Sequence, residues 1–276
     1  MTGLPRFAGH RILVTGAARG IGAAVARRLA EEGGRVLLTD RDLPEAERTA
    51  AGLRDRGLAA EACACDVADR NSVEAAVERA VTSFGGLDVL VNSAAHCTPD
   101  LPLYEDQPDD AWDLDLDITL AGVHRCCRAA LPHLAASGRG AIVSIGSVNA
   151  AADFGNHAYS AAKAALVSLT RTLAGHAAAR GVRVNLVEPG TVRTSAWAGR
   201  DDELAAVTPL YPLGRVGEPA DIAAAVAFLA SRDAAWITGT TLRVDGGLTA
   251  VHTGFHAALR PHRTGGSAVP RRGGAQ

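Results

Sequence analysis

The chain has 276 residues, of which 47% are hydrophobic and 21% are charged, and its formal net charge is -2. This composition is typical of a globular protein with a sizeable core, and the nearly neutral charge disfavours nucleic acid or an anionic membrane as a partner. No stretch approaches the roughly 20 apolar residues that a membrane-spanning helix requires.

The cysteines and the N-terminus predict a cytoplasmic protein. Cys63, Cys65, Cys97, Cys126 and Cys127 are an odd number without paired metal-ligand spacing, and MTGLPRFAGHR contains no apolar signal segment. We therefore expect free thiols in a reducing cytoplasm. None of the nine histidines lies in a motif such as H-E-x-x-H. We expect no metal.

Short apolar runs alternate with alanine-rich amphipathic segments along the chain. The runs are residues 11–15, 35–39, 60–64, 88–92, 141–145, 182–187 and 241–244. Continuous apolar runs are typical of strands buried on both faces, and their alternation with helices predicts a parallel sheet. We predict an α/β chain with one doubly wound (Rossmann) domain over residues 1–250, built on a seven-stranded parallel sheet with helices on both faces. Such sheets bind ligands at the carboxyl ends of their strands.

The first of these strand ends carries the loop TGAARGIG, residues 15–22, before a predicted helix. Three glycines permit a tight turn and let backbone N–H groups approach a pyrophosphate, while the helix N-terminus favours negative charge. Between a strand and a helix, they predict dinucleotide binding rather than a turn that only packs. The expected coenzyme contacts here are Gly16, Arg19, Gly20, Ile21 and Gly22.

Asp40 ends the second predicted strand, about 20 residues beyond the glycine loop, the distance expected for a ribose-binding carboxylate. This carboxylate can accept hydrogen bonds from both ribose hydroxyls of an adenosine and would repel a 2′-phosphate. Arg19 and Arg41 act in the opposite direction, because a guanidinium pairs with that phosphate. We predict NAD as the cofactor, with NADP as the alternative. The other interpretation of Asp40 is a solvated turn.

The only lysine of the chain, Lys163, lies four residues after Tyr159 in HAYSAAKAAL. In a helix predicted over residues 157–179 both lie on one face. A phenol has a pKa of about 10, so exchanging a proton near neutrality requires stabilisation of its anion, which a close ammonium and a cationic nicotinamide can supply. Arginine cannot give up a proton to a relay. We therefore predict a proton-carrying pair rather than a surface helix pair.

Ser147 follows the strand at 141–145, at the same edge of the sheet and twelve residues before Tyr159. From there its hydroxyl is expected to bind the carbonyl or alcohol that undergoes hydride transfer. Ser144 lies inside the strand and is expected to be packed.

From about residue 8 to 250 the chain resembles the short-chain dehydrogenase/reductase family. The matching motifs are TGAARGIG, Asp66-Val67, LVN ending in Asn92, Ser147, the Tyr159–Lys163 pair, EPG (188–190) with Thr194, GEPADIAAAVAFLAS and ITGTTLRVDGG. The resemblance implies an NAD(P)-dependent enzyme that interconverts a small-to-medium secondary alcohol and a ketone. It implies that Tyr159 is the general acid/base, that Ser147 orients the substrate, and that Lys163 holds the nicotinamide ribose and lowers the pKa of the tyrosine.

The resemblance also implies further coenzyme contacts and a quaternary state. The contacts are Asp66, Val67, Asn92, Ala94, Pro189, Gly190, Val192 and Thr194. The implied assembly is a homotetramer, or a homodimer, built partly from helices around 110–135 and 157–179.

Two positions depart from the family pattern. The chain has Asn92-Ser93-Ala94-Ala95 where Asn-Asn-Ala-Gly is common, so we expect a loop that bends less freely and narrows the cleft. Thr119 stands where the family has an asparagine that holds a relay water. Threonine can hold a water through its hydroxyl or its carbonyl, with different reach. We count Thr119 with the catalytic residues and expect altered proton transfer rather than loss of activity.

Residues 195–212 are expected to cover the substrate, with Trp197 and Tyr211 as apolar walls. Further candidates for the rim, each more typical of a packing or surface residue, are His96, Asn149, Asp153, Phe154 and His157. The Gly/Pro/Arg-rich tail at 251–276 is typical of disorder. The alternative is that Phe255 and Leu259 dock near an active site.

Two other functions remain open. A dinucleotide-binding fold can act as a sensor or scaffold without turnover, although such a protein needs only the nucleotide half of this site. An epimerase or dehydratase that uses transient hydride transfer shares the tyrosine and lysine, but usually has different glycine spacing and a larger C-terminal domain.

Overall fold

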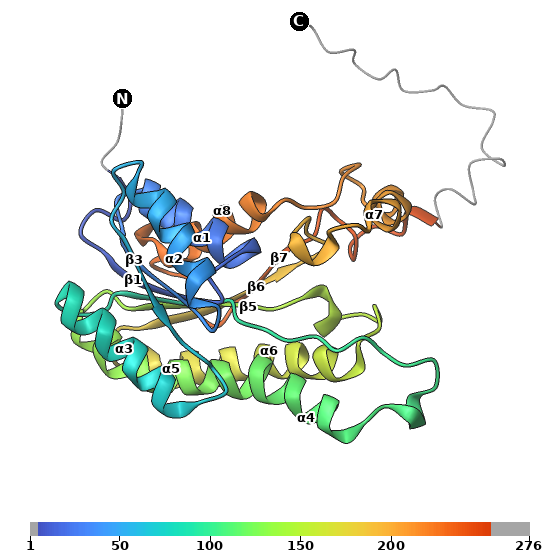
Figure 1. Ribbon diagram of the computed structural model, residues 1–276, viewed down its shortest axis with the longest axis horizontal. Coiled ribbons are helices and arrows are strands. Elements are labelled where there is room, and N and C mark those ends of the chain that lie inside the picture. Colours follow the sequence, from blue (N-terminus) through green and yellow to red (C-terminus); the bar gives the residue numbers. More distant parts are fainter. Residues whose placement is uncertain (1–4, 255–276) are drawn as a thin grey trace, which may run out of the picture.

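A single parallel sheet of seven strands forms the centre of the computed structural model, which describes residues 5–254 (Figure 1). The strand order is β3-β2-β1-β4-β5-β6-β7. The strands are β1 (Arg11–Thr15), β2 (Arg35–Asp40), β3 (Ala60–Ala64), β4 (Val89–Asn92), β5 (Ala141–Ile145), β6 (Arg183–Pro189) and β7 (Thr241–Val244). The predicted doubly wound fold and its seven strands are confirmed, with bounds that differ by at most two residues.

Helices cover both faces of the sheet (Figure 1). On one face lie α1 (Gly20–Glu31), α2 (Leu43–Arg54) and α8 (Pro219–Ala230), and on the other lie α3 (Arg70–Phe84), α4 (Asp109–Leu116), α5 (Gly122–Ala136) and α6 (His157–Ala178). A π-turn at Asp117–Ala121 joins α4 to α5. The short α7 (Asp201–Val207) follows β6. Among residues 5–254 no helix has the length and apolarity needed to span a bilayer.

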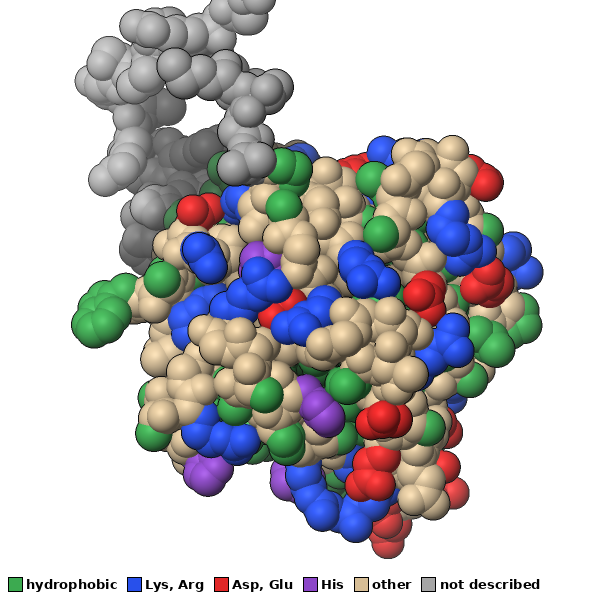
Figure 2. Space-filling view, turned by 90° about the vertical axis from the view of Figure 1, so that its left-hand side faces the viewer, with side chains coloured by type: hydrophobic (Ala, Val, Ile, Leu, Met, Phe, Trp, Pro, Cys, Tyr) green, Lys and Arg blue, Asp and Glu red, His purple; other side chains and the backbone are tan. Residues whose placement is uncertain are grey.

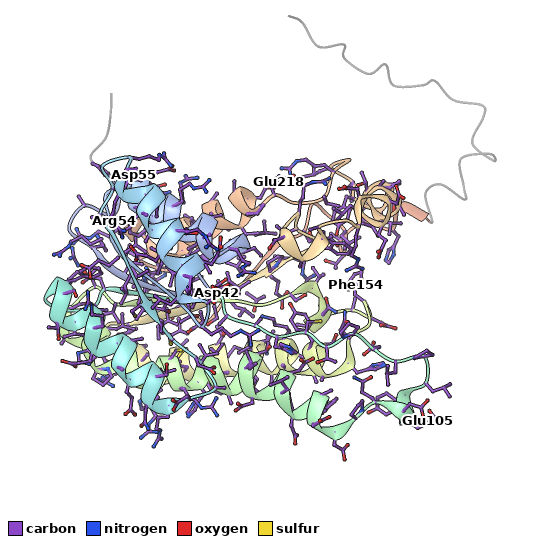
Figure 3. The ribbon with its side chains drawn as sticks, in the orientation of Figure 1. Asp42, Arg54, Asp55, Glu105, Phe154 and Glu218 are labelled. Carbon is purple, nitrogen blue, oxygen red and sulfur yellow. The ribbon has the colours of Figure 1, made fainter. Side chains whose placement is uncertain are left out.

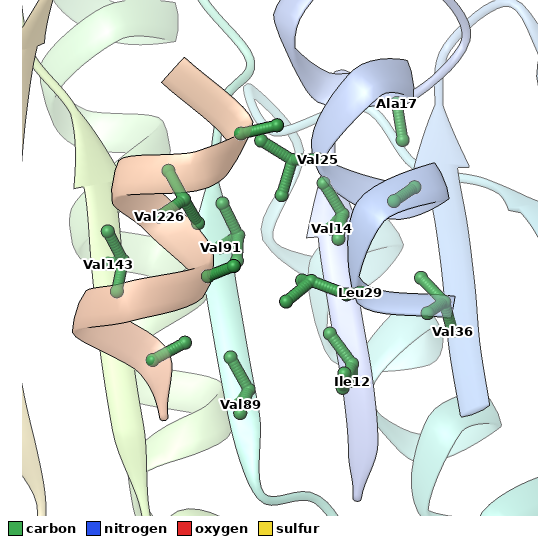
Figure 4. Packing of buried hydrophobic residues seen from close by; sticks show 14 of the residues in the cluster. Ile12, Val14, Ala17, Val25, Leu29, Val36, Val89, Val91, Val143 and Val226 are labelled. Carbon is green, nitrogen blue, oxygen red and sulfur yellow. The ribbon is translucent and has the colours of Figure 1, made fainter. Parts of the chain in front are cut away.

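Alternation of side chains along each strand divides the core into two layers. Ile12 and Val14 lie on the face covered by α1 and α8, in one cluster with Val25 and Val226 (Figure 4). Leu13, between them, belongs to the other layer, under α3, α5 and α6. Burying each such side chain contributes about 1.5–3 kcal/mol, so both faces of the strands must be covered.

The order of the strands creates a crevice between β1 and β4, where the chain turns to opposite sides of the sheet. Thr15, the last residue of β1, lies at this crevice. Its hydroxyl oxygen accepts hydrogen bonds from the backbone N–H groups of Ser93, at 3.1 Å, and Ala94, at 3.3 Å. The loops after β1 and β4 are therefore held together where a coenzyme is expected.

Basic side chains gather on the side of the molecule where the strands begin (Figure 2). Asp88, just before β4, is fully buried there and accepts hydrogen bonds from the guanidinium groups of Arg11 and Arg139. These bonds hold the pKa of the Asp88 carboxyl well below its usual range, against the opposing effect of burial. The three side chains tie together the beginnings of β1, β4 and β5.

Candidate active site

A cleft of about 420 Å³ opens at the carboxyl ends of β1 to β4. It is lined by Gly16, Arg19, Asp40, Arg41, Asp42, Cys65, Asp66, Val67, Ser93, Ala94, Ala95, His96 and Ile118. Seven of these are coenzyme contacts predicted from the sequence: Gly16, Arg19, Asp40, Arg41, Asp66, Val67 and Ala94. The structure thus brings together residues that lie far apart in the chain.

Two glycines of the loop are required by its tight turn, because a side chain at either position would collide with neighbouring backbone. Gly16 has φ 62°, and a Cβ there would lie 2.7 Å from the Cα of Ala94. A Cβ on Gly22 would lie 2.1 Å from the carbonyl oxygen of Gly16. The first turn of α1 carries no acidic side chain, so its N–H groups and helix dipole favour an anion. The dinucleotide expected from the sequence therefore fits this loop.

The adenosine end of the cleft is organised around Asp40. Its carboxylate accepts hydrogen bonds from the backbone N–H groups of Ala18, at 3.1 Å, and Asp42, at 3.0 Å. The guanidinium of Arg19 is paired with the carboxylate of Asp42, whose position beside the carboxyl end of the sheet is visible in Figure 3. The exposed Arg41 lines the same cleft. Of the two arginines that could favour NADP, Arg19 is therefore already paired with a carboxylate.

The structure brings Ser147, Tyr159 and Lys163 together where β5 meets α6. Lys163 is 2% exposed, and its Nζ donates a hydrogen bond of 2.6 Å to the carbonyl oxygen of Ile145. The same Nζ lies 5.2 Å from the centroid of the half-buried Tyr159 ring. Ser147 is 8% exposed and begins the short turn after β5. Two of these side chains are thus anchored to the end of one strand.

Ser147 is oriented by Asn149, a residue that the sequence suggested only as a rim candidate. The Ser147 hydroxyl donates to Oδ1 of Asn149 at 2.8 Å and accepts from its backbone N–H at 3.2 Å. The Asn149 amide nitrogen in turn donates to Gly155 O and Ser160 Oγ. Asn149 therefore links the serine to the beginning of α6.

The expected lowering of the tyrosine pKa, which we ascribed to Lys163 together with a cationic nicotinamide, is not a property of the polypeptide by itself. Burial raises the pKa of Tyr159 to about 12, although the adjacent Ser147 hydroxyl acts in the opposite direction. Burial also lowers the pKa of Lys163 to about 8. Desolvation disfavours the charged form of both groups, so each is biased toward its neutral state. A further positive charge, such as the cationic nicotinamide considered from the sequence, is therefore required to make the phenol acidic near neutrality.

Thr119 is fully buried in the π-turn, and its hydroxyl is engaged both as a donor and as an acceptor. The hydroxyl donates to the carbonyl oxygen of His96 and accepts from the N–H of His96, both at 3.0 Å. The hydroxyl can therefore no longer donate to a water, and it keeps one lone pair with which to accept from one. The side chain instead locks the loop after β4 onto the π-turn.

The loop Asn92-Ser93-Ala94-Ala95 needs no glycine. Asn156 is the one non-glycine residue with positive φ within the described part of the chain, so Ala95 adopts an ordinary conformation. The expected restriction on bending therefore has no basis in backbone strain. Asn92 itself is buried, and its amide nitrogen donates to Oγ of Ser144 at 3.0 Å. The prediction that Ser144 is packed is confirmed.

The segment after β6 approaches the glycine loop. The side chain of Thr194 lies 3.5 Å from the position that a Cβ on Gly20 would occupy. Val192 forms an isolated bridge with Gly217, and the backbone N–H of Gly190 bonds to the carbonyl of Val244. Pro189 is the last residue of β6 and directly precedes this segment.

The prediction that Tyr211 is an apolar wall of the substrate site is wrong. Tyr211 is 4% exposed, and it packs against Leu204 and Val216. Its hydroxyl oxygen accepts a hydrogen bond from the N–H of Thr191 at 2.8 Å. Its ring is therefore committed to anchoring the segment after β6. Trp197 is half-buried, with the Arg200 guanidinium 4.3 Å above its ring.

Loop residues beyond Ser147 form the outer rim. Phe154 is 42% exposed, and Figure 3 shows it on the side where the strands end. Asp100 accepts hydrogen bonds from the N–H groups of Asn156, at 2.5 Å, and His157, at 2.9 Å. It thereby caps the helix that carries Tyr159. Phe255 and Leu259, the residues of the docking hypothesis, lie outside the described residues.

Thr15 and Asp115 are site residues that our sequence reasoning missed. The signal for Thr15 was its place at the start of the TGAARGIG motif. Asp115 lay in an acidic segment, DLDLD, that is also typical of a solvated helix face, and its burial appeared only in the structure.

Comparison with known proteins agrees with this geometry. A family profile described as enoyl-(acyl carrier protein) reductase matches residues 16–249. The chain is 45% identical over 247 residues to the cis-4-hydroxycyclohexanecarboxylate dehydrogenase of Sinomonas cyclohexanicum, covering 89% of this chain and 98% of that protein. It is 42% identical over 250 residues to the D-threitol dehydrogenase of Mycolicibacterium smegmatis, covering 88% and 94%.

A solved dehydrogenase/reductase from Sinorhizobium meliloti 1021 has the same fold, with a TM-score of 0.82 at 36% identity, covering 90% of this chain and 98% of that chain. Nearly the whole length of each of these proteins aligns with this chain. The protein is an oxidoreductase that acts on CH–OH or C=O groups, and it belongs to the short-chain dehydrogenase/reductase family.

Proposed function

We propose that the protein interconverts a secondary alcohol and a ketone with NAD, using Tyr159 as the general acid/base. The observation that carries this proposal is the convergence of Ser147, Tyr159 and Lys163 at the strand end that adjoins the dinucleotide cleft. When bound, the nicotinamide supplies the hydride acceptor or donor. The remaining work, which is to orient the substrate oxygen and to move its proton, falls to these three side chains.

In the oxidation direction, the Ser147 hydroxyl turns from Asn149 to donate its one hydrogen bond to the substrate oxygen, while Tyr159 removes the hydroxyl proton. Lys163 is fixed by Ile145, so its ammonium stays beside the phenol and stabilises the phenolate. Because burial lowers the pKa of Lys163 to about 8, the lysine also gives up a proton readily. In the reduction direction the same groups return the proton to the alkoxide.

We infer NAD as the coenzyme from the surroundings of Asp40. The Asp40 carboxylate lines the adenosine end of the cleft, where it accepts ribose hydroxyls and repels a 2′-phosphate. Arg19 pairs with Asp42, whereas Arg41 forms no ion pair within residues 5–254 and is the predicted partner for a 2′-phosphate. NADP remains the alternative coenzyme.

We propose a ring-borne secondary alcohol of small to medium size as the substrate. The support is the 45% identity to a dehydrogenase of cis-4-hydroxycyclohexanecarboxylate, whose hydroxyl lies on a saturated ring. The exposed Phe154 and the half-buried Trp197 offer apolar surface for such a ring. A linear polyol is the competing class, because a D-threitol dehydrogenase is 42% identical.

The other coenzyme contacts are proposed on their positions. They are Gly16, Gly20, Ile21 and Gly22 at the pyrophosphate, Asp66 and Val67 at the adenine, Asn92 and Ala94 beside the ribose, and Pro189, Gly190, Val192 and Thr194 at the nicotinamide. We further propose a catalytic domain over residues 1–250 with a separate tail at 251–276, a homotetramer or homodimer, and a cytoplasmic location.

The test is to mix the protein with NAD or NADP and a panel of cyclic and linear alcohols and to follow the absorbance of the reduced coenzyme. We expect reduction of NAD with cyclic secondary alcohols. Coenzyme binding without turnover of any alcohol or ketone would support the sensor alternative. Conversion of an alcohol into an isomer or an alkene, without accumulation of reduced coenzyme, would support the epimerase or dehydratase alternative.

A further inference from the structure

A histidine and a buried carboxylate beside the cleft have no part in the mechanism above. His96 lines the coenzyme cleft, and its side chain is 30% exposed. Its Nδ1 lies 2.7 Å from Oδ1 of Asp115, a side chain that is 1% exposed. The Asp115 carboxylate also accepts hydrogen bonds from the backbone N–H and the hydroxyl of Thr98.

This arrangement selects one form of the imidazole ring. A carboxylate only accepts hydrogen bonds, so Nδ1 of His96 carries a proton and Nε2 is left as an acceptor in the neutral ring. A carboxylate that holds one ring nitrogen keeps the other nitrogen ready to take and release a proton. The buried Asp115 has no basic partner other than His96 among the described residues.

The backbone of His96 is held as firmly as its ring. The hydroxyl of Thr119 bonds to both the N–H and the carbonyl of His96, at 3.0 Å each. Because Asp115 lies in α4 and Thr119 in the following π-turn, one continuous segment positions the whole residue. A group fixed by two neighbours is suited to proton transfer because its geometry is set before the reaction.

The same segment adjoins the Tyr159–Lys163 pair. Helix α6, which carries that pair, packs against α4 and the π-turn. Asp115 and Cys97 are close enough to raise the pKa of Tyr159, and Cys97 also influences Lys163. Burial raises the pKa of the Cys97 thiol to about 11, so this thiol does not carry protons near neutrality.

The other charged groups that line the cleft lie toward its adenosine end. They are Arg19, Asp40, Arg41, Asp42 and Asp66. His96 is the one histidine that lines this cleft in residues 5–254. His96 therefore supplies this cleft with an imidazole, the side-chain type that most often transfers protons in enzymes.

We propose that His96, held by Asp115 and Thr119, passes the substrate proton from the Tyr159–Lys163 pair to solvent. The proposal rests on the dehydrogenase function proposed above. In oxidation, the alcohol C–H bond breaks and its electron pair leaves as hydride to the oxidised coenzyme, while the O–H proton moves to Tyr159 and the carbonyl forms. The proton continues through Lys163 and water to Nε2 of His96, and the imidazolium releases it to bulk water.

The test compares His96→Gln and His96→Ala with the parent enzyme. We expect kcat for alcohol oxidation to fall about tenfold in both variants, because a positioned proton carrier contributes at least that much, and KM to change less than about twofold. The solvent deuterium isotope effect on kcat increases. Added imidazole restores kcat in His96→Ala and not in His96→Gln. His176→Gln, which removes an exposed histidine from α6, is the matched control and keeps the parental values.

A measurement without turnover tests the role of Asp115. In the nitrogen NMR spectrum of the ¹⁵N-histidine-labelled protein, His96 shows the Nδ1–H form, and Asp115→Asn abolishes this preference. If Asp115→Asn does not fold, Thr119→Val is measured in its place. This variant removes only the two hydrogen bonds to the backbone of His96, and we expect the His96 nitrogen signals to broaden. A parent enzyme that oxidises no alcohol overturns the proposed function. A His96→Gln enzyme with the parental kcat and isotope effect, or a His96→Ala enzyme that imidazole does not restore, overturns the relay alone.

Discussion

Lys163 donates a 2.6 Å hydrogen bond from Nζ to the carbonyl oxygen of Ile145, the last residue of β5. This bond fixes the ammonium between the strand that leads to Ser147 and the helix that carries Tyr159. Burial lowers the pKa of Lys163 to about 8 and raises that of Tyr159 to about 12. Desolvation disfavours the charged form of both groups, although a lysine with a pKa of about 8 is still mostly protonated at pH 7. Binding of a further positive charge is what shifts the tyrosine toward the phenolate.

The first prediction concerns Tyr159→Phe. Removing the phenol oxygen eliminates the proton acceptor, so we expect kcat to fall by at least about 10²-fold. Binding of NADH, followed by its fluorescence, remains close to parental because the glycine loop and Asp40 are untouched. Tyr211→Phe is the matched control, because it removes the hydroxyl of a tyrosine that bonds, within residues 5–254, to the backbone of Thr191 alone. Parental turnover by Tyr159→Phe would contradict the assignment.

The second prediction concerns the pH dependence of stability. The pKa of Lys163 is about 8 in the folded protein against 10.5 as an ordinary lysine, so above pH 8 the unfolded chain binds more protons at this residue. The free energy of unfolding contributed by Lys163 therefore increases as pH rises from about 8 to 10, by up to about 1.4 kcal/mol per pH unit. Urea denaturation of the parent and of Lys163→Met across this range isolates the effect. Parallel curves for the two proteins would contradict it.

The third prediction concerns the coenzyme. Asp40→Ala removes the charge that repels a 2′-phosphate, so we expect the ratio of kcat/KM for NADP to that for NAD to rise by on the order of tenfold or more. Asp66→Ala, on the neighbouring strand end, serves as the comparison because its side chain is assigned to the adenine. An unchanged ratio in Asp40→Ala would assign the coenzyme preference to other residues.

The fourth prediction concerns the opposite end of the sheet. Asp88→Asn leaves Arg11 and Arg139 without their shared carboxylate, so we expect the free energy of unfolding at neutral pH to fall by about 3 kcal/mol. The pKa of Asp88 is lowered, and its contribution is present above the ordinary aspartate value of 3.8 and is lost as pH falls below it. The difference between the parent and the variant should therefore shrink in acid, and a constant difference would argue against the charge as its cause.

The fifth prediction concerns Thr119. Thr119→Val removes a buried hydroxyl that bonds twice to His96, which is expected to cost about 1–3 kcal/mol of stability. Thr119→Ser retains the hydroxyl and is expected to keep most of this stability and the parental turnover. Equal denaturation midpoints for the two variants would show that these bonds contribute little.

The sequence by itself determined the α/β architecture and the pairing of Tyr159 with Lys163 on one helix. The seven apolar runs and the helices between them define the sheet because each depends on local hydrophobic periodicity, and their bounds agree with the structure. Tyr159 and Lys163 lie on one helical face for the same reason: spacing of four residues is a local property of any helix. The glycine loop could also be predicted, because its motif consists of adjacent residues between a strand and a helix.

The tertiary structure decided everything that depends on segments far apart in the chain. Tyr211 is a structural anchor because Thr191 donates to it, and no local pattern indicates that contact. Arg19 pairs with Asp42 because the loops after β1 and β2 meet at one edge of the sheet. Asp115 is buried against His96 because α4 folds back onto the loop that follows β4. The direction of the shift in the tyrosine pKa was also a tertiary property, because desolvation depends on how completely the surrounding segments close over the phenol.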